Sequence, residues 1–172
     1  MKKFAWRFSA VGSTIDFKIK YFSISNISGN FEGFWGTVNA SEGFENPEVE
    51  VTLDTVSINV NNERRNKKIR STACLHAREY PNVLFRAKDG CKLSEGKIRE
   101  LTGELTIKNI TREITLVINY SHMKKGHNPA IIVFSLFGCF SRKDFNLSME
   151  DDKLDDEIYL NAFLELSRTD EK

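Results

Sequence analysis

The chain has 172 residues, of which 40% are hydrophobic and 28% charged, and its formal net charge is +1. This composition is typical of one folded domain, expected over residues 1–172, and it excludes a disordered chain. A net charge so close to zero argues against long-range attraction to nucleic acid or to an anionic membrane. Phenylalanine is frequent, with 13 residues. Its excess indicates either a dry packed core or a cavity for an apolar ligand.

The N-terminus begins with Met1, Lys2 and Lys3, but Arg7 and Asp16 interrupt the following stretch, so we expect no signal peptide. No apolar run approaches the roughly 20 residues that cross a bilayer. The cysteines are odd in number and form no CxxC pair, which favours free thiols in a reducing compartment. They are Cys74, Cys91 and Cys139. We therefore expect a cytoplasmic protein.

Alternation of apolar and polar residues with a period of two predicts strands along most of the chain. Each predicted strand has one apolar and one polar face, as a half-buried antiparallel strand does. In chain order these segments are 4–8, 15–19, 49–53, 83–85, 101–107, 114–118 and 158–166. Isolated glycines at 29, 33 and 36 indicate bulges or sharp bends within the sheet.

Two segments depart from this alternation. Residues 61–80 are polar and basic, and they predict a short helix followed by a crossing loop that ends at Pro81. Residues 130–140 are apolar on both faces, which indicates a strand covered outside as well as inside, for example at a subunit contact. Many strands without covering helices leave a sandwich or a barrel. Long strands and interior glycines favour a closed antiparallel barrel, because closure removes unpaired edges.

Six short patterns follow one another in a characteristic order. They are Trp6 with Ser13; Gly29, Phe31, Phe34 and Gly36; Ser57 and Ile58 with the loop 65–71; Tyr80, Pro81 and Phe85; Gly103, Leu105, Thr106, Ile107 and Thr111; and Arg142, Asp144 and Phe145. From residue 6 to about residue 166 the chain thus resembles the YceI-like family of polyisoprenoid-binding proteins. Polar positions depart from the family pattern, since Gly12, Asn66 and Lys68 stand where the family has His, Asp and His.

The resemblance implies a bacterial protein with a single eight-stranded, extended, lipocalin-like β-barrel. It also implies lipid binding: a polyisoprenoid, a quinone tail or a fatty acyl or amide chain is carried or sequestered inside the barrel. Burial of one methylene group is worth about 0.8 kcal/mol, so such a ligand needs few polar contacts. We expect the lining to comprise Phe17, Ile19, Phe31, Phe34, Val51, Leu53, Phe85, Leu105, Ile107, Leu116, Phe134, Phe140 and Arg142. Alternatively, these side chains fill the interior and leave no cavity.

Charged residues near the expected barrel mouth have two interpretations. Arg142 and Asp144 lie among apolar residues, where they either pair with each other or with the backbone, or contact a ligand head group. Arg65 and Arg70 contact a head group only if the 61–80 loop folds over the mouth. Otherwise the basic residues of this segment, which are Arg64, Arg65, Lys67, Lys68 and Arg70, belong to a solvated loop.

Two other classes of function compete with lipid binding: a scaffold and an enzyme that acts on a bound lipid. A scaffold that acts as a homodimer without lipid would bury Ile131, Val133 or Phe137 at its interface. An enzyme is not expected, because neither a nucleotide motif nor a GxSxG motif occurs and Cys74 with His76 forms no evident nucleophile–base pair. We expect no metal or cofactor, since the remaining histidines, His122 and His127, are too few to bind one.

Overall fold

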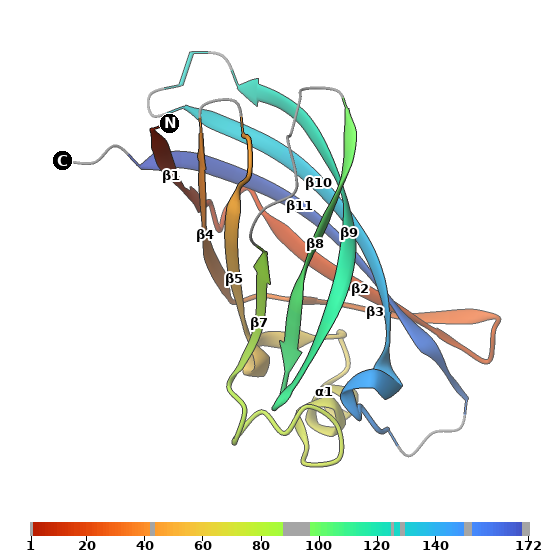
Figure 1. The fold of residues 1–172 in the computed structure, drawn as a ribbon. Coiled ribbons are helices and arrows are strands. Elements are labelled where there is room, and N and C mark those ends of the chain that lie inside the picture. Colours follow the sequence, from red (N-terminus) through yellow and green to blue (C-terminus); the bar gives the residue numbers. More distant parts are fainter. Residues whose placement is uncertain are drawn as a thin grey trace.

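The protein is described by a computed structural model that covers residues 2–41, 44–87, 97–124, 126–127, 130–149 and 153–169. Within these residues, eleven strands form one sheet, and every strand pair is antiparallel (Figure 1). The start of the first strand and the end of the last strand lie at the upper end of the barrel in this view. No helix in the described ranges is long and apolar enough to span a membrane.

Eight of the strands close into a ring. In spatial order they are β1 (Lys3–Phe8), β4 (Phe34–Ser41), β5 (Glu48–Asp54), β7 (Asn82–Ala87), β8 (Ile98–Ile107), β9 (Ile110–Lys124), β10 (Ile131–Ser141) and β11 (Leu154–Thr169). The ring closes where Phe8 of β1 lies opposite Leu166 of β11. The prediction of a lipocalin-like, antiparallel, eight-stranded barrel is therefore confirmed.

The long strand β11 makes the barrel extended. Its C-terminal end pairs with β1, whereas its N-terminal part pairs with β2 (Thr14–Tyr21), from Leu154 opposite Tyr21 to Phe163 opposite Thr14. Two further strands continue the sheet from β2, namely β3 (Ser25–Phe31) and β6 (Ile58–Asn59). The lower half of the molecule is thus walled in part by strands that do not belong to the closed ring.

Short helices gather at the lower end (Figure 1). They are η1 (Thr55–Ser57), α1 (Glu63–Arg70) and η2 (Arg142–Phe145). The Asn62 side chain caps α1 by accepting a hydrogen bond from the Arg65 N–H at 3.0 Å. Asn66 is buried, and its Oδ1 accepts from the Val60 N–H at 2.9 Å, which ties α1 to the chain after β6. The short helix predicted in the 61–80 segment is confirmed.

The two-sided apolar segment forms β10, but a subunit contact is not needed to cover Val133. The pairing of β10 with β9 shifts between Val133 and Phe134, and this bulge places consecutive side chains in buried positions. Val133 is 1% exposed and Ile132 is fully buried in the single chain, while Phe137 remains 51% exposed. The expectation that Val133 contributes to a dimer surface is therefore wrong.

Candidate ligand-binding site

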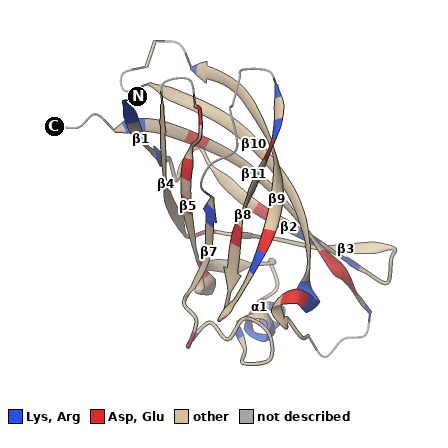
Figure 2. Cartoon of the chain, in the orientation of Figure 1, with Lys and Arg blue, Asp and Glu red and all other residues tan. Residues whose placement is uncertain are grey.

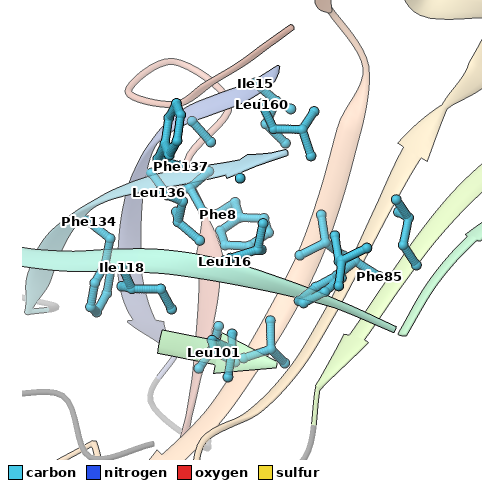
Figure 3. A pocket seen from close by; sticks show the side chains of 18 of the residues that line it. Phe8, Ile15, Phe85, Leu101, Leu116, Ile118, Phe134, Leu136, Phe137 and Leu160 are labelled. Atoms are coloured by element: carbon cyan, nitrogen blue, oxygen red, sulfur yellow. The ribbon is translucent and has the colours of Figure 1, made fainter. Parts of the chain in front are cut away.

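The upper part of the barrel contains a cavity of about 130 Å³. Its walls are apolar side chains from most of the strands of the ring (Figure 3). Among them, Phe8, Phe85, Leu116 and Phe134 converge from four different strands. The inward faces of the strands therefore do not fill the interior completely.

A second cavity of about 120 Å³ lies in the lower part. Side chains of β2, β3, β8 and β11 wall it, and α1 and the following loop contribute Ile69, Cys74 and Leu75. Two charged residues, Arg65 and Arg142, also line it. The lower cavity is thus apolar with cations at its border.

The two cavities adjoin. Four residues line both of them, namely Leu53, Val83, Leu105 and Leu160. On β10 the lining extends from Phe134 to Phe140, six residue steps or about 20 Å along the strand. Water in a cavity needs two to four polar partners, which these walls hardly offer. The space is suited to a long apolar chain rather than to water.

The structure places twelve of the thirteen residues expected in the lining along these cavities. Val51, Phe85, Leu116 and Phe134 line the upper one, and Leu53 and Leu105 line both. The other six, at the lower cavity, are Phe17, Ile19, Phe31, Ile107, Phe140 and Arg142. Phe34 packs against the core without lining either cavity. Contact of these residues with a ligand stays a prediction.

Other lining residues were not anticipated. Phe8 and Ile15 belong to alternating segments, so the period-two signal extends to them. Phe44 and Pro47 lie in the connection between β4 and β5, where no periodicity marks them, although both are buried. Phe44 packs between Trp6 and Phe134, with ring centroids 5.2 and 5.7 Å away.

Arg142 is held by the backbone rather than by Asp144. Its Nε donates to the carbonyl of Asp155 at 3.0 Å, its Nη1 to that of Leu147 at 3.1 Å and its Nη2 to that of Leu154 at 3.4 Å. The nearest carboxylate in an ion pair is that of Asp156, at 3.5 Å from Nη2. Of the two interpretations, the structure supports pairing with the backbone. Arg142 joins η2 to the start of β11.

Replacement of Arg142 by Met is expected to lower the free energy of unfolding by about 2–4 kcal/mol, because three carbonyls lose a charged donor. Urea denaturation measures the change. Lys143→Met is the matched control: the Lys143 side chain is 69% exposed and pairs only with Asp156 among the interactions described. Its loss is expected to cost about 0.5 kcal/mol. Equal losses for the two variants would contradict this role of Arg142.

A third space, which we call the vestibule, opens beside the lower cavity and measures about 480 Å³. It shares Ile27, Arg65, Met149 and Leu154 with that cavity. Its further lining consists of Asn62, Arg64, Lys68, Ser71, Ala73 and Ser148. The expectation of a solvated basic loop is thus incomplete, because some of its basic residues line a pocket on one side of α1.

Arg65 and Arg70 take different roles on this helix. Arg65 is half-buried and lines both the vestibule and the lower cavity. Arg70 instead donates from Nη2 to the Ile58 carbonyl at 3.0 Å and lies 3.8 Å from the Glu63 carboxylate. Of these two arginines, Arg65 is therefore the one placed to meet a ligand in the lower cavity.

The two described cysteines are free. Burial, the main cause, raises the pKa of Cys74 to about 11, while the Cys139 thiol is exposed and its pKa is also raised. Cys91 lies outside the described residues. Within those residues no group of three His, Cys, Asp or Glu side chains is arranged to hold a metal ion.

Alkylation of Cys74 by iodoacetamide at pH 8 is expected to be slow. Because the pKa of the Cys74 thiol is raised from 9.0 to about 11, its thiolate fraction is lower. The decrease at pH 8 is roughly a hundredfold. Its rate is expected to keep rising as the pH approaches 11. Peptide mass mapping measures the rate, with the urea-unfolded chain as the control. Equal rates in the folded and unfolded chains would contradict a buried, protonated thiol.

Known proteins with similar sequences show the family to which this chain belongs. The sequence model of the YceI-like domain matches residues 6–166. The chain belongs to the YceI-like family. Protein YceI of Salmonella newport is 31% identical over 142 residues, which cover 79% of this chain and 71% of the relative. Over most of the barrel, the family resemblance seen in the motifs is therefore confirmed.

Solved structures of YceI-like proteins have the same fold. The YceI protein of Campylobacter jejuni superposes with a TM-score of 0.77 and is 30% identical, covering 90% of this chain and 91% of its own. A polyisoprenoid-binding domain from Saccharophagus degradans superposes with a TM-score of 0.73 at 13% identity, covering 96% and 99%. At that identity the likeness shows a shared fold alone.

Proposed function

We propose that the protein binds a long apolar lipid inside the barrel and carries or sequesters it. The adjoining upper and lower cavities are the observation that carries this proposal, since together they offer an apolar space elongated along β10. Membership of the YceI-like family supports it, as does the fold shared with a polyisoprenoid-binding domain. Candidate ligands are a polyisoprenoid, a quinone tail and a fatty acyl or amide chain.

The energetics favour an apolar chain in this space. Each methylene group that leaves water contributes about 0.8 kcal/mol, so ten of them contribute about 8 kcal/mol before the costs of association. Side chains that face an empty cavity lack contact partners, and a bound chain restores these contacts. No catalytic group is required for such binding.

Organic extraction of the purified protein, followed by mass spectrometry, tests the proposal. We expect a lipid with a long unbranched or isoprenoid chain in near-stoichiometric amount. Delipidated protein is expected to regain thermal stability when such a lipid is added, because a ligand that binds only the folded state stabilises it. Absence of lipid in the extract, together with no stabilisation by any of the candidate chains, would refute lipid binding.

A homodimeric scaffold is the second candidate, and one surface favours it. Phe137 of β10 and Phe163 of β11 lie diagonally across the strand pair and are 51% and 46% exposed, although Phe137 also borders the upper cavity (Figure 3). A second copy that covers this patch would remove both rings from water. Light scattering at high protein concentration tests this candidate: it predicts a dimer that Phe137→Ser together with Phe163→Ser dissociates, whereas a monomer refutes it.

A further inference from the structure

Three cations of α1 face one pocket. Arg64, Arg65 and Lys68 all line the vestibule. They lie at positions i, i+1 and i+4 of the helix, which brings Arg64 and Lys68 onto neighbouring turns of the same side. Figure 2 shows basic residues on α1 at the lower end of the barrel. The vestibule is therefore a pocket whose one wall is positively charged.

Among the described residues, no carboxylate forms an ion pair with Arg64, Arg65 or Lys68. No Asp or Glu from the described ranges lines the vestibule either. Several cations elsewhere do pair with a carboxylate, as in the contacts of Lys124 with Glu165 and of Arg86 with Glu50. Like charges four residues apart destabilise a helix. An anion in the vestibule would relieve this repulsion.

The vestibule adjoins the lower cavity at Arg65. The Arg65 side chain lines both spaces, and Ile69, one turn further along α1, lines only the lower cavity. A chain in the lower cavity therefore ends beside a cationic wall. Arginine donates paired hydrogen bonds to carboxylate and phosphate oxygens, and lysine is a compact point charge for the same groups.

We propose that the bound lipid is an anionic amphiphile whose carboxylate or phosphate head group occupies the vestibule, among Arg64, Arg65 and Lys68. This inference rests on the proposed lipid binding and adds the chemistry of the head group. The tail extends from Arg65 past Ile69 into the lower cavity and towards the upper one. The α1 end is then the end at which the lipid head group remains in contact with water.

Matched probes that differ only in head-group charge test the inference. Palmitate is compared with palmitamide, and geranylgeranyl phosphate with geranylgeraniol, by isothermal titration calorimetry on the delipidated full chain. We expect each anionic probe to bind about tenfold more tightly than its neutral counterpart, since hydrogen bonds to charged groups are the stronger ones. Added salt is expected to weaken the binding of the anionic probes selectively.

Paired variants assign the preference to the vestibule. Arg64→Gln with Lys68→Gln is expected to weaken palmitate binding about tenfold and to leave palmitamide binding unchanged. Lys67→Gln with Arg78→Gln removes the same net charge from exposed positions that do not line the vestibule, so it is expected to change neither. Arg65 is kept in both variants because it also packs against the lower cavity.

The outcomes separate this inference from lipid binding itself. Equal affinity for the anionic and neutral probes would overturn the inference while lipid binding stands. Equal loss of palmitate affinity in the two double variants would also overturn it, because the effect would then come from net charge. Binding of none of the four probes would refute both proposals. Inorganic phosphate that binds as tightly as geranylgeranyl phosphate would show an anion site independent of a lipid tail, which also contradicts the inference.

Discussion

Val83→Phe is expected to divide the interior and to abolish the binding of long chains. Val83 is buried and lines both cavities, so a larger ring at this position occupies the space where they meet. A chain that loses contact for five methylene groups loses about 4 kcal/mol, which corresponds to roughly a thousandfold in affinity. Titration with palmitamide measures this loss, and octanamide, whose chain is half as long, is expected to occupy one cavity and to bind as in the native protein.

Leu84→Phe provides the matched control for Val83→Phe. Leu84 is the next residue on β7 and is half-buried, and it lines neither cavity. Its replacement is expected to leave palmitamide binding within twofold of the native value. Because Val83→Phe fills open space, its unfolding free energy is expected to stay within about 1 kcal/mol of the native value, below the usual cost of overpacking a filled core. Undiminished palmitamide binding by a folded Val83→Phe protein would place the ligand elsewhere.

Gly36→Ala is expected to be among the most destabilising small changes, because the space beside this glycine is already taken. A Cβ atom here would overlap the backbone carbonyl oxygen of Glu50 and lie 2.6 Å from Cε2 of Phe8. Relief requires a shift of β5 relative to β4 or a displacement of the Phe8 ring from the upper cavity. We expect a loss of about 3 kcal/mol in unfolding free energy, measured by urea denaturation.

Gly138→Ala is the control for Gly36→Ala, because its new Cβ would meet a flexible side chain instead of the backbone. Its Cβ would lie 2.5 Å from Cδ2 of Leu116, the tip of a flexible side chain beside the upper cavity, and 3.8 Å from the next atoms. Leu116 can rotate into that cavity, so we expect a loss of about 1 kcal/mol or less. A loss as large as that of Gly36→Ala would show that the cavity does not absorb the displaced side chain.

The strand positions and most of the cavity lining were predictable from local patterns. Alternation in segments such as 101–107 identifies the residues that share a face, and closure of the sheet turns that face inward, as Leu105 illustrates. The family motifs, which lie at six places along the chain, implied the closed barrel. The short helix was predictable because the 61–80 segment lacks alternation.

The strand β3, the burial of Val133 and the hydrogen-bond partners of Arg142 could not be predicted from local patterns. The segment of β3 reads SNISGNF, and its polar side chains give no strand signal. It forms because its backbone pairs with β2 and β6, and that pairing depends on segments distant in sequence. The buried position of Val133 depends on a register shift against β9, which a period-two pattern does not reveal. Arg142 likewise acquires its carbonyl partners only when β11 begins beside η2.

The sequence by itself therefore determined the all-β class, the apolar face of each main strand and the cluster of positive charge between residues 63 and 70, since these depend on side-chain order along the chain. Only the tertiary structure decided whether the inward side chains meet or leave a cavity, because that depends on the diameter of the closed ring rather than on the order of residues. It also decided that Arg65 joins the cationic wall of α1 to an apolar space. Packing of α1 against the end of the barrel brings these two regions together. A local sequence pattern does not reveal this contact, because the residues involved are far apart in the chain.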